Sequence, residues 1–325
     1  MRDQKQNSRR YVYYMQITRR CNNRCVFCSN PFIDTEMTVK EALSRACDAV
    51  RRGTTDIIVT GGEPTLHEEL DRIITGIAAT GARPHLISNG VELSDKDKVM
   101  SLIEAGLEKV HISFHSHRKA VAESVCGVTG HHARVLKGIH NCIDAGMHVD
   151  ITIPLHARLV DHLDACIQFL TRMFPGIHHY VFNGIDAGYS DGKMPNRAAL
   201  NCWIVPKLTE LEVPLYKTLN ALIAQGKTYR VERIPLCYIQ GHEYCCTETR
   251  QIVKEETPSI RFLRDGGEAD EKAEVMREKT SVCQVCPLNM ICAGVCGSYR
   301  KIHGDNELFP VFGSTGTIIE NIREK

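Results

Sequence analysis

The chain has 325 residues, 43% of them hydrophobic, and its 40 Lys and Arg residues nearly balance 39 Asp and Glu residues, for a formal net charge of +1. A chain of this size can bury a substantial core, as one large barrel or a barrel with an appended domain. The balanced charge provides no long-range attraction for nucleic acid or anionic membranes, so we expect neither as a partner. No apolar run of eighteen or more residues occurs, and the start MRDQKQNSRR lacks a signal-type segment, which favours a soluble cytoplasmic protein.

The chain contains fifteen cysteines, which would suggest a disulfide scaffold only in a short secreted protein. Ten of them fall in two clusters, one at residues 21–28 and one between Cys237 and Cys296, and this distribution favours metal binding. The other five are scattered, and we expect them to be small buried hydrophobic residues: Cys47, Cys126, Cys142, Cys166 and Cys202.

The first predicted strand, residues 12–17, leads into Cys21, Cys25 and Cys28, spaced C-x3-C-x2-C. This spacing offers three thiolates to a four-iron cluster and leaves one iron without cysteine, where a substrate-like molecule can bind. The alternative is a zinc knuckle, which requires four ligands. No His or Cys lies between Cys28 and Cys47, so a local zinc site would lack its fourth ligand.

A helix predicted over 38–52 is followed by an apolar strand at 56–61 that runs into the sequence GGEP. The glycines permit close backbone approach, and a carboxylate such as Glu63 suits an ammonium group. The motif CNNRCVFC, with Phe27 before its third cysteine, followed by GGEP, resembles the radical SAM superfamily. That resemblance implies a [4Fe-4S] cluster on the three cysteines, whose open iron chelates S-adenosylmethionine (SAM). It also implies that the GGEP loop contacts the SAM amino group, through Gly61, Gly62, Glu63 and Pro64.

Further apolar runs alternate with helix-period segments and complete six predicted βα units. Composition alone does not distinguish a doubly wound sheet from a barrel, but the resemblance implies a partial (β/α)6 TIM-type barrel with its chemistry at the carboxyl ends of the strands. The remaining predicted strands are 85–88, 109–114, 148–154 and 178–184, and the remaining helices are 67–80, 94–106, 131–145, 159–173 and 205–225.

Single polar residues at the later strand ends are candidates for completing the SAM site. The resemblance implies that Asn89 lies near the SAM ribose, that Ser113 contacts the methionine carboxylate or ribose, and that Thr152 and Asn183 face the adenosine. The alternative for each is an ordinary strand-end hydrogen bond to the backbone.

Three further residues follow the fourth predicted strand, at the face where chemistry is expected. His115 and His117 are candidates for touching substrate, and Cys126, in a predicted turn, is a candidate hydrogen-atom donor. The pair His131 and His132 is expected on the polar surface.

The βα alternation stops at about Arg233, so we predict a barrel domain over 1–230 and a cysteine-rich domain over 231–325. The pattern C-x2-C-x5-C-x3-C from Cys283 to Cys296 resembles the SPASM and twitch extensions of radical SAM enzymes, which hold auxiliary iron-sulfur clusters. The simplest assignment is one auxiliary [4Fe-4S] cluster on Cys237, Cys283, Cys286 and Cys292.

The match to a full SPASM pattern is incomplete, because no cysteine follows Cys296. Two fully cysteine-ligated clusters would require eight thiolates, and this region has seven. Cys245, Cys246 and Cys296 are therefore either spare or ligands of a second, open cluster, and a zinc ribbon built on Cys283 and Cys286 is an alternative.

The resemblance implies reductive cleavage of SAM to a 5′-deoxyadenosyl radical, which takes a hydrogen atom from substrate, with an electron donor such as flavodoxin or ferredoxin. A ribosomally made peptide or protein is the first expectation for the substrate, and a sugar, cyclitol or cofactor precursor is the alternative. Only about eleven residues precede the first strand, so we expect any leader recognition to come from a separate protein. Two hypotheses from other classes are a non-catalytic iron-sulfur electron carrier and a nucleic-acid-binding zinc module.

Overall fold

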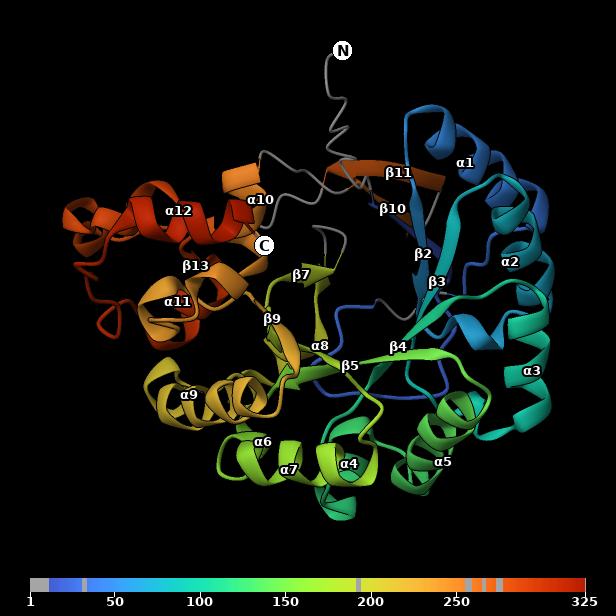
Figure 1. The fold of residues 1–325 in the computed structure, drawn as a ribbon, viewed down its shortest axis with the longest axis horizontal. Coiled ribbons are helices and arrows are strands. Elements are labelled where there is room, and N and C mark those ends of the chain that lie inside the picture. Colours follow the sequence, from blue (N-terminus) through green and yellow to red (C-terminus); the bar gives the residue numbers. More distant parts are fainter. Residues whose placement is uncertain are drawn as a thin grey trace, which may run out of the picture.

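The structure is a computed structural model, and it describes residues 12–30, 34–190, 194–254, 259–264, 267–272 and 277–324. Its strands form a curved inner sheet with helices around the outside (Figure 1). The sheet strands are β1 Val12–Thr18, β2 Asp56–Gly61, β3 Arg83–Ser88, β4 Lys109–Ser113, β5 His148–Leu155, β6 His179–Gly184, β9 Thr228–Glu232, β10 Ser259–Arg264 and β11 Gly267–Lys272. Short two-residue strands are β7 Tyr189–Ser190, β8 Met194–Pro195, β12 Arg277–Glu278 and β13 Val295–Cys296. The α-helices are α1 Val39–Arg51, α2 Leu70–Ala79, α3 Lys96–Glu104, α4 Lys119–Cys126, α5 His131–Asp144, α6 Ala157–Val160, α7 Leu163–Met173, α8 Arg197–Leu200, α9 Leu208–Ala224, α10 Thr247–Lys254, α11 Gly297–His303 and α12 Thr315–Glu324.

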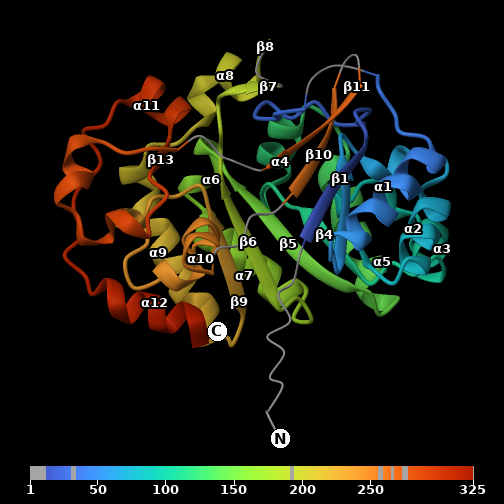
Figure 2. The ribbon, with the colours of Figure 1, turned by 90° about the horizontal axis from the view of Figure 1, so that it is seen from above.

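The main sheet has the order β11-β10-β1-β2-β3-β4-β5-β6-β9. All neighbours from β10 to β9 are parallel, and β11 pairs antiparallel with β10. Because β11 and β9 remain as edges, the barrel is open (Figure 2). The predicted partial barrel is confirmed, with its six predicted strands adjacent in chain order. The sheet also has three strands that were not predicted, and one of these, β9, runs across the expected boundary at residue 230.

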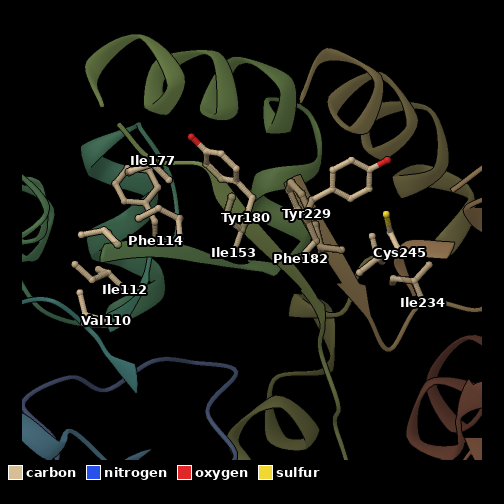
Figure 3. Packing of buried hydrophobic residues seen from close by; sticks show 14 of the residues in the cluster. Val110, Ile112, Phe114, Ile153, Ile177, Tyr180, Phe182, Tyr229, Ile234 and Cys245 are labelled. Atoms are coloured by element: carbon tan, nitrogen blue, oxygen red, sulfur yellow. The ribbon is translucent and has the colours of Figure 1, made fainter. Parts of the chain in front are cut away.

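Alternation along the strands separates a helix-facing side from a barrel-facing side. In β1, Tyr13, Met15 and Ile17 are buried, whereas Tyr14 and Gln16 between them are only half-buried. The same pattern recurs in β4 and β6, whose buried residues form part of the core in Figure 3: Val110, Ile112, Tyr180 and Phe182. The core therefore lies between the sheet and its helices, while the other face of the strands lines the barrel interior.

The predicted helices differ from the structure mainly at their ends, whereas α4, α8 and the helices after residue 240 were not predicted. The helix α1 begins where predicted because Thr38 and Glu41 form a reciprocal capping box. The predicted helix 67–80 begins only at Leu70, since a separate 3₁₀ turn occupies Pro64–Leu66. The predicted turn around Cys126 was wrong, because this residue ends helix α4, which stops at Gly127 in the left-handed conformation with φ of 67°.

The C-terminal segment packs beside β9 and α9 (Figures 1 and 2). The hydroxyl of Tyr299 accepts the backbone N–H of Leu208 at 2.8 Å, and Thr209 donates to Glu307 at 2.6 Å. These bonds join the C-terminal segment to the first turn of α9 and satisfy one of that helix's free N–H groups. None of the described helices combines the length and apolar composition that crossing a membrane requires.

A buried carboxylate network lies at the amino ends of the central strands. Asp150 is only 1% exposed. Its carboxylate accepts hydrogen bonds from Lys109 Nζ at 2.9 Å and from His148 Nε2 at 3.0 Å, and His111 Nδ1 lies 3.4 Å from it. Burial lowers the pKa of His111 to about 4, although Asp150 opposes the shift. At the amino ends of the barrel strands, the buried carboxylate of Asp150 is therefore satisfied by the lysine and histidine side chains around it.

The low pKa of His111 makes stability depend on pH in a defined window. The unfolded chain protonates this histidine near its ordinary pKa of 6.5, whereas the folded chain resists protonation down to about 4. The free energy of unfolding should therefore fall as pH drops from 6.5 towards 4, by about 1.4 kcal/mol per pH unit from this residue. Urea unfolding between pH 7 and pH 5 should show a shallower pH slope in H111N than in wild type. The exposed-histidine control H140N should keep the wild-type slope, and an unchanged slope in H111N would contradict the assignment.

Candidate functional site

The cysteine loop, residues 19–30, follows the carboxyl end of β1. Cys21 is exposed, and Cys25 and Cys28 are half-buried. The backbone N–H groups of Asn23 and Asn30 each donate, at 3.4 Å, to the sulfurs of Cys21 and Cys28 respectively. Although Cys21 is exposed as a residue, desolvation by the protein atoms around its thiol, with a further contribution from Glu63 and the two neighbouring cysteines, raises its pKa to about 12. A bound metal cation would offset this effect, since metal coordination deprotonates a thiol.

A glycine clamp, defined here as Gly61 and Gly62 against Thr18–Arg20, holds the GGEP turn on the cysteine loop. The N–H of Gly62 donates to Thr18 O and that of Glu63 to Arg20 O, both at 2.7 Å. A Cβ on Gly62 would lie 2.2 Å from Arg20 O, and one on Gly61, whose φ is +148°, would lie 2.2 Å from Thr18 O. Only glycine fits this approach, so both positions fix the two motifs against each other.

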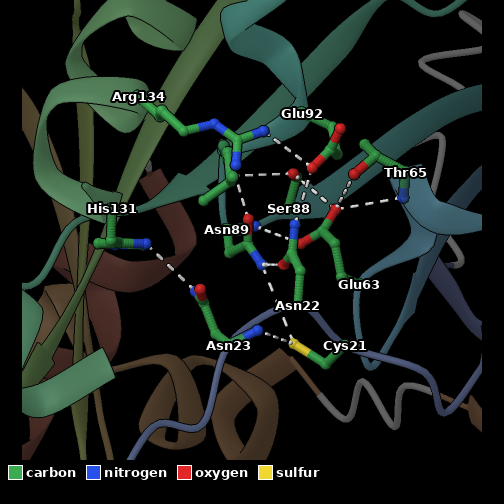
Figure 4. Close-up of polar contacts among 12 residues, drawn as sticks. Cys21, Asn22, Asn23, Glu63, Thr65, Ser88, Asn89, Glu92, His131 and Arg134 are labelled. Carbon is green, nitrogen blue, oxygen red and sulfur yellow. Dashed lines mark hydrogen bonds and ion pairs between the residues drawn. The ribbon is translucent and has the colours of Figure 1, made fainter. Parts of the chain in front are cut away.

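Glu63 braces the same turn from inside (Figure 4). Its carboxylate accepts Thr65 Oγ1 at 2.6 Å and Thr65 N at 3.1 Å, as well as Ser88 Oγ at 2.8 Å and Asn89 N at 2.6 Å. The residue is 1% exposed, and burial raises the pKa of its carboxyl group against the effect of these bonds. Both oxygens of the Glu63 carboxylate therefore accept hydrogen bonds from protein groups at the ends of β2 and β3. The sequence had suggested an ammonium group as the partner of this carboxylate.

Asn89 is the predicted strand-end residue that lies beside the cysteine loop. Its Nδ2 donates to Asn22 Oδ1 at 2.7 Å and lies 3.9 Å from Cys21 Sγ (Figure 4). Asn22 in turn donates to Glu92 at 3.0 Å, and Arg134 donates to the same carboxylate. The carboxyl end of β3 is therefore tied directly to the first cysteine.

The other predicted strand-end residues lie on consecutive neighbouring strands. Ser113 of β4 pairs in register with Thr152 of β5, and both are half-buried. On β6, Asn183 pairs with Glu232 of β9. The Oδ1 atom of Asn183 is buried and has no hydrogen-bond partner among the described residues. An unsatisfied buried acceptor at this end of the barrel is what a ligand site would leave in the unbound protein.

Two histidine rings lie near Cys25: His115, which the sequence suggested as a substrate contact, and His131, which was not predicted as part of the site. The His115 ring lies 5.3 Å from Phe27 and 5.7 Å from His131, centroid to centroid. His131 is only 2% exposed, so its expected surface position was wrong; Asn23 lies 3.3 Å from its Nδ1. Burial lowers the pKa of His131 to about 3. The ring is therefore neutral and packs as part of the wall behind the loop.

A second missed contact comes from α8, which sequence patterns did not indicate. The N–H of Arg197 donates to Cys28 O at 3.2 Å, and its Nη1 donates to Cys25 O at 3.3 Å. Asn201, next to this helix, donates to Val26 O at 3.4 Å. These donors hold the second half of the cysteine loop, whereas the glycine clamp holds its first residues.

Four cysteines line a single small cavity in the C-terminal region. Backbone N–H groups donate to two of the sulfurs, from Val311 to Cys286 at 3.4 Å and from Gly294 to Cys292 at 3.3 Å. Such N–H donors, a largely apolar wall and several thiols are the surroundings that iron-sulfur clusters use. The four are those that the sequence assigned to one auxiliary cluster: Cys237, Cys283, Cys286 and Cys292.

Cys246 and Cys296, which also belong to the C-terminal group of cysteines, do not line this cavity. Cys246 Sγ lies 3.4 Å from Glu248 Oε2, and Arg277 Nη1 donates to Cys296 Sγ at 3.2 Å. Glu248 and Arg277 also pair with each other. An ion pair therefore lies against these two sulfurs.

Comparison with known proteins places this geometry in a family. Residues 15–170 match the radical SAM superfamily. Fe-coproporphyrin III synthase from Methanosarcina barkeri is 28% identical over 180 residues, which cover 53% of this chain and 45% of the relative. PqqA peptide cyclase from Rhodopseudomonas palustris is 31% identical over 202 residues, which cover 61% of this chain and 51% of the relative. The chain thus spans about half the length of these curated relatives.

Solved structures share the fold over nearly all of the chain. Streptococcus suis SuiB bound to S-adenosylmethionine superposes with a TM-score of 0.65 at 14% identity, covering 94% of this chain and 77% of SuiB. Native anSMEcpe with bound AdoMet gives a TM-score of 0.63 at 13% identity, covering 96% of both chains. The cysteine loop, the GGEP turn and the ends of β3 to β5 all fall within the family match, so residues 15–170 form a radical SAM domain.

Proposed function

We propose that this protein is a radical SAM enzyme that holds a [4Fe-4S] cluster through Cys21, Cys25 and Cys28 and modifies a ribosomally made peptide or protein. The observation that carries the proposal is the glycine clamp, which holds a three-thiol loop against the GGEP turn at the carboxyl face of an open barrel. When bound, the cluster and SAM supply a 5′-deoxyadenosyl radical, which takes hydrogen atoms from substrates.

The chain's own residues bind and position these groups. Backbone N–H groups donate to the sulfurs of Cys21 and Cys28, and Phe27 packs on the His115 ring behind the loop. The Nδ2 atom of Asn89 lies 3.9 Å from Cys21 Sγ, and we assign this strand-end residue to SAM. Ser113, Thr152 and Asn183 extend the SAM site along the next three strands.

Relatives support a peptide substrate. PqqA peptide cyclase is named for a peptide, and SuiB is solved bound to the precursor peptide SuiA. The second candidate is a small molecule, because Fe-coproporphyrin III synthase and a probable GTP 3′,8-cyclase also match. The chemistry requires a one-electron donor such as flavodoxin or ferredoxin, which fits a cytoplasmic enzyme.

We also propose one auxiliary [4Fe-4S] cluster in the C-terminal cavity, in a domain that begins near residue 231. The cavity brings four thiols together, whereas Glu248 and Arg277 lie against Cys246 and Cys296. This arrangement supports a single auxiliary cluster with four cysteine ligands rather than two auxiliary clusters, one of them open. A tetrathiolate zinc site is the alternative occupant, and metal analysis distinguishes the two.

The first test concerns the proposed reaction. Anaerobically reconstituted protein with SAM and dithionite should form 5′-deoxyadenosine, and C28A should lose at least about 100-fold of that activity together with about four irons per chain. The expected burial of Cys47 and Cys202 was wrong, since both are exposed, so the control C47A removes an exposed thiol on α1 and should retain both properties. Wild-type protein that binds iron but yields no 5′-deoxyadenosine would support the electron-carrier hypothesis instead.

The second test concerns the C-terminal cavity. C286A removes a thiol that lines it, and this variant should hold about four irons fewer per chain than wild type after reconstitution. C245A removes a buried thiol outside the lining set and should hold as much iron as wild type. Equal iron in C286A and wild type, or zinc in place of iron, would refute the auxiliary cluster.

The third test concerns the glycine clamp. In G62A the added methyl group overlaps the carbonyl oxygens of Arg20 and Arg19, at 2.2 and 2.5 Å, so the loop must move. We expect a loss of about 2 kcal/mol or more in the free energy of unfolding, with a reduced share of iron at the N-terminal cysteines. The control G176A adds a methyl group with ordinary 3.9 Å contact and should behave as wild type. Full iron occupancy in G62A would show that the clamp is dispensable.

A further inference from the structure

We propose that Cys25, His115 and Cys126 form a zinc-type metal site in the cluster-free protein, and that occupation of this site excludes the N-terminal cluster. One ligand atom from each residue lies within 4.8 Å of the other two. The metal-binding part of the proposal stands by itself, whereas the exclusion rests on the proposed role of Cys25 as a cluster ligand.

Backbone bonds, rather than side-chain conformation alone, bring the two cysteines together. On either side of Cys25, the N–H of Arg24 donates to Cys126 O at 2.8 Å and that of Val26 donates to Val125 O at 2.9 Å. Gly127 supports the contact, because a Cβ there would lie 3.2 Å from the Arg24 backbone and side chain. The cysteine loop is thus paired along the last turn of α4, and this pairing sets Cys25 opposite Cys126.

His115 supplies an independent sign of a ligand site. The residue is 4% exposed, and its Nδ1 is buried without a hydrogen-bond partner among the described residues. The ring is held between Phe27 and His131, and His156 Nε2 lies 2.9 Å from the His115 carbonyl oxygen. A buried imidazole nitrogen with no partner is costly, and a metal ion would satisfy it.

The donor set selects the class of metal. Two thiolates and one imidazole suit Zn²⁺, with water in the fourth position of a tetrahedral site. Binding converts the thiols of Cys25 and Cys126 to thiolates and releases their two protons. Cys126 is 0% exposed, so the metal would lie behind the loop. A Cys25 sulfur held there cannot also ligate iron together with Cys21 and Cys28.

The test compares C126A with C142A in the full-length protein. Both replace a cysteine of 0% exposure on neighbouring helices, so the two variants lose similar packing. Cluster-free protein is titrated with Co²⁺, read by thiolate-to-cobalt absorbance, and then with Zn²⁺. We expect C126A to bind about one ion fewer than wild type, or to bind it at least about 100-fold more weakly, while C142A matches wild type. Equal stoichiometry and affinity in all three proteins would overturn the site.

A second measurement tests the exclusion. One equivalent of Zn²⁺ beyond the capacity of the C-terminal cavity is added before iron reconstitution, and iron bound at the N-terminal cysteines is counted. Zinc should reduce this iron at least about 10-fold in wild type and C142A, and less than about 2-fold in C126A. Equal suppression in C126A would overturn the exclusion. Failure of the proposed function would appear separately, as missing iron at Cys21, Cys25 and Cys28 in zinc-free wild type.

Discussion

The close approach of two backbone segments, Thr18–Arg20 and Gly61–Glu63, is the constraint on which the site depends. Two hydrogen bonds of 2.7 Å cross between them, and the absence of a Cβ at both glycines is what permits this separation. The cysteine loop itself has no helix or strand between Thr18 and Glu36 in its described residues, so its shape must come from such contacts. The GGEP turn thus acts first as a scaffold, and any cofactor contact it makes follows from that placement.

Buried polar groups occur at both ends of the barrel strands, and some of them have hydrogen-bond partners while others do not. At the amino ends, Asp150 is paired with Lys109 and two histidines, which makes that end a stabilising element. At the carboxyl ends, Asn183 Oδ1 and His115 Nδ1 are buried without partners among the described residues. Because an unsatisfied buried polar atom is destabilising, these two atoms are candidate ligand contacts. Their position agrees with the general placement of chemistry at the carboxyl ends of strands in parallel barrels.

Local signals allowed much of the fold and part of the site to be predicted. The six core strands are short segments with continuous or alternating apolar residues, and the cysteine and GGEP motifs are short-range patterns, so both were visible in the sequence. The strand β11, with the sequence GEADEK, has no apolar alternation, and α8 spans four residues, so neither gave a signal. Arg197 and Cys25 are 172 positions apart, and only the folded chain brings them together. Spacing rules therefore find ligands that are close in sequence and miss the residues that hold them.

The proposed auxiliary cluster would contribute to the fold of the C-terminal region. Apart from β10 and β11, which join the barrel sheet, the described strands of this region, β12 and β13, have two residues each, and its helices have seven to ten residues, so regular structure contributes little cohesion. Burial raises the pKa of the cavity thiol Cys237 to about 12, and burying several such polarisable groups around open space gains little packing energy. A cluster changes both terms, because it converts the thiols to ligands and fills the cavity with covalent cross-links between Cys237 and the segment from Cys283 to Cys292. The proposed auxiliary cluster would thus form the core of the C-terminal region, and a role in electron transfer would be added to this structural one.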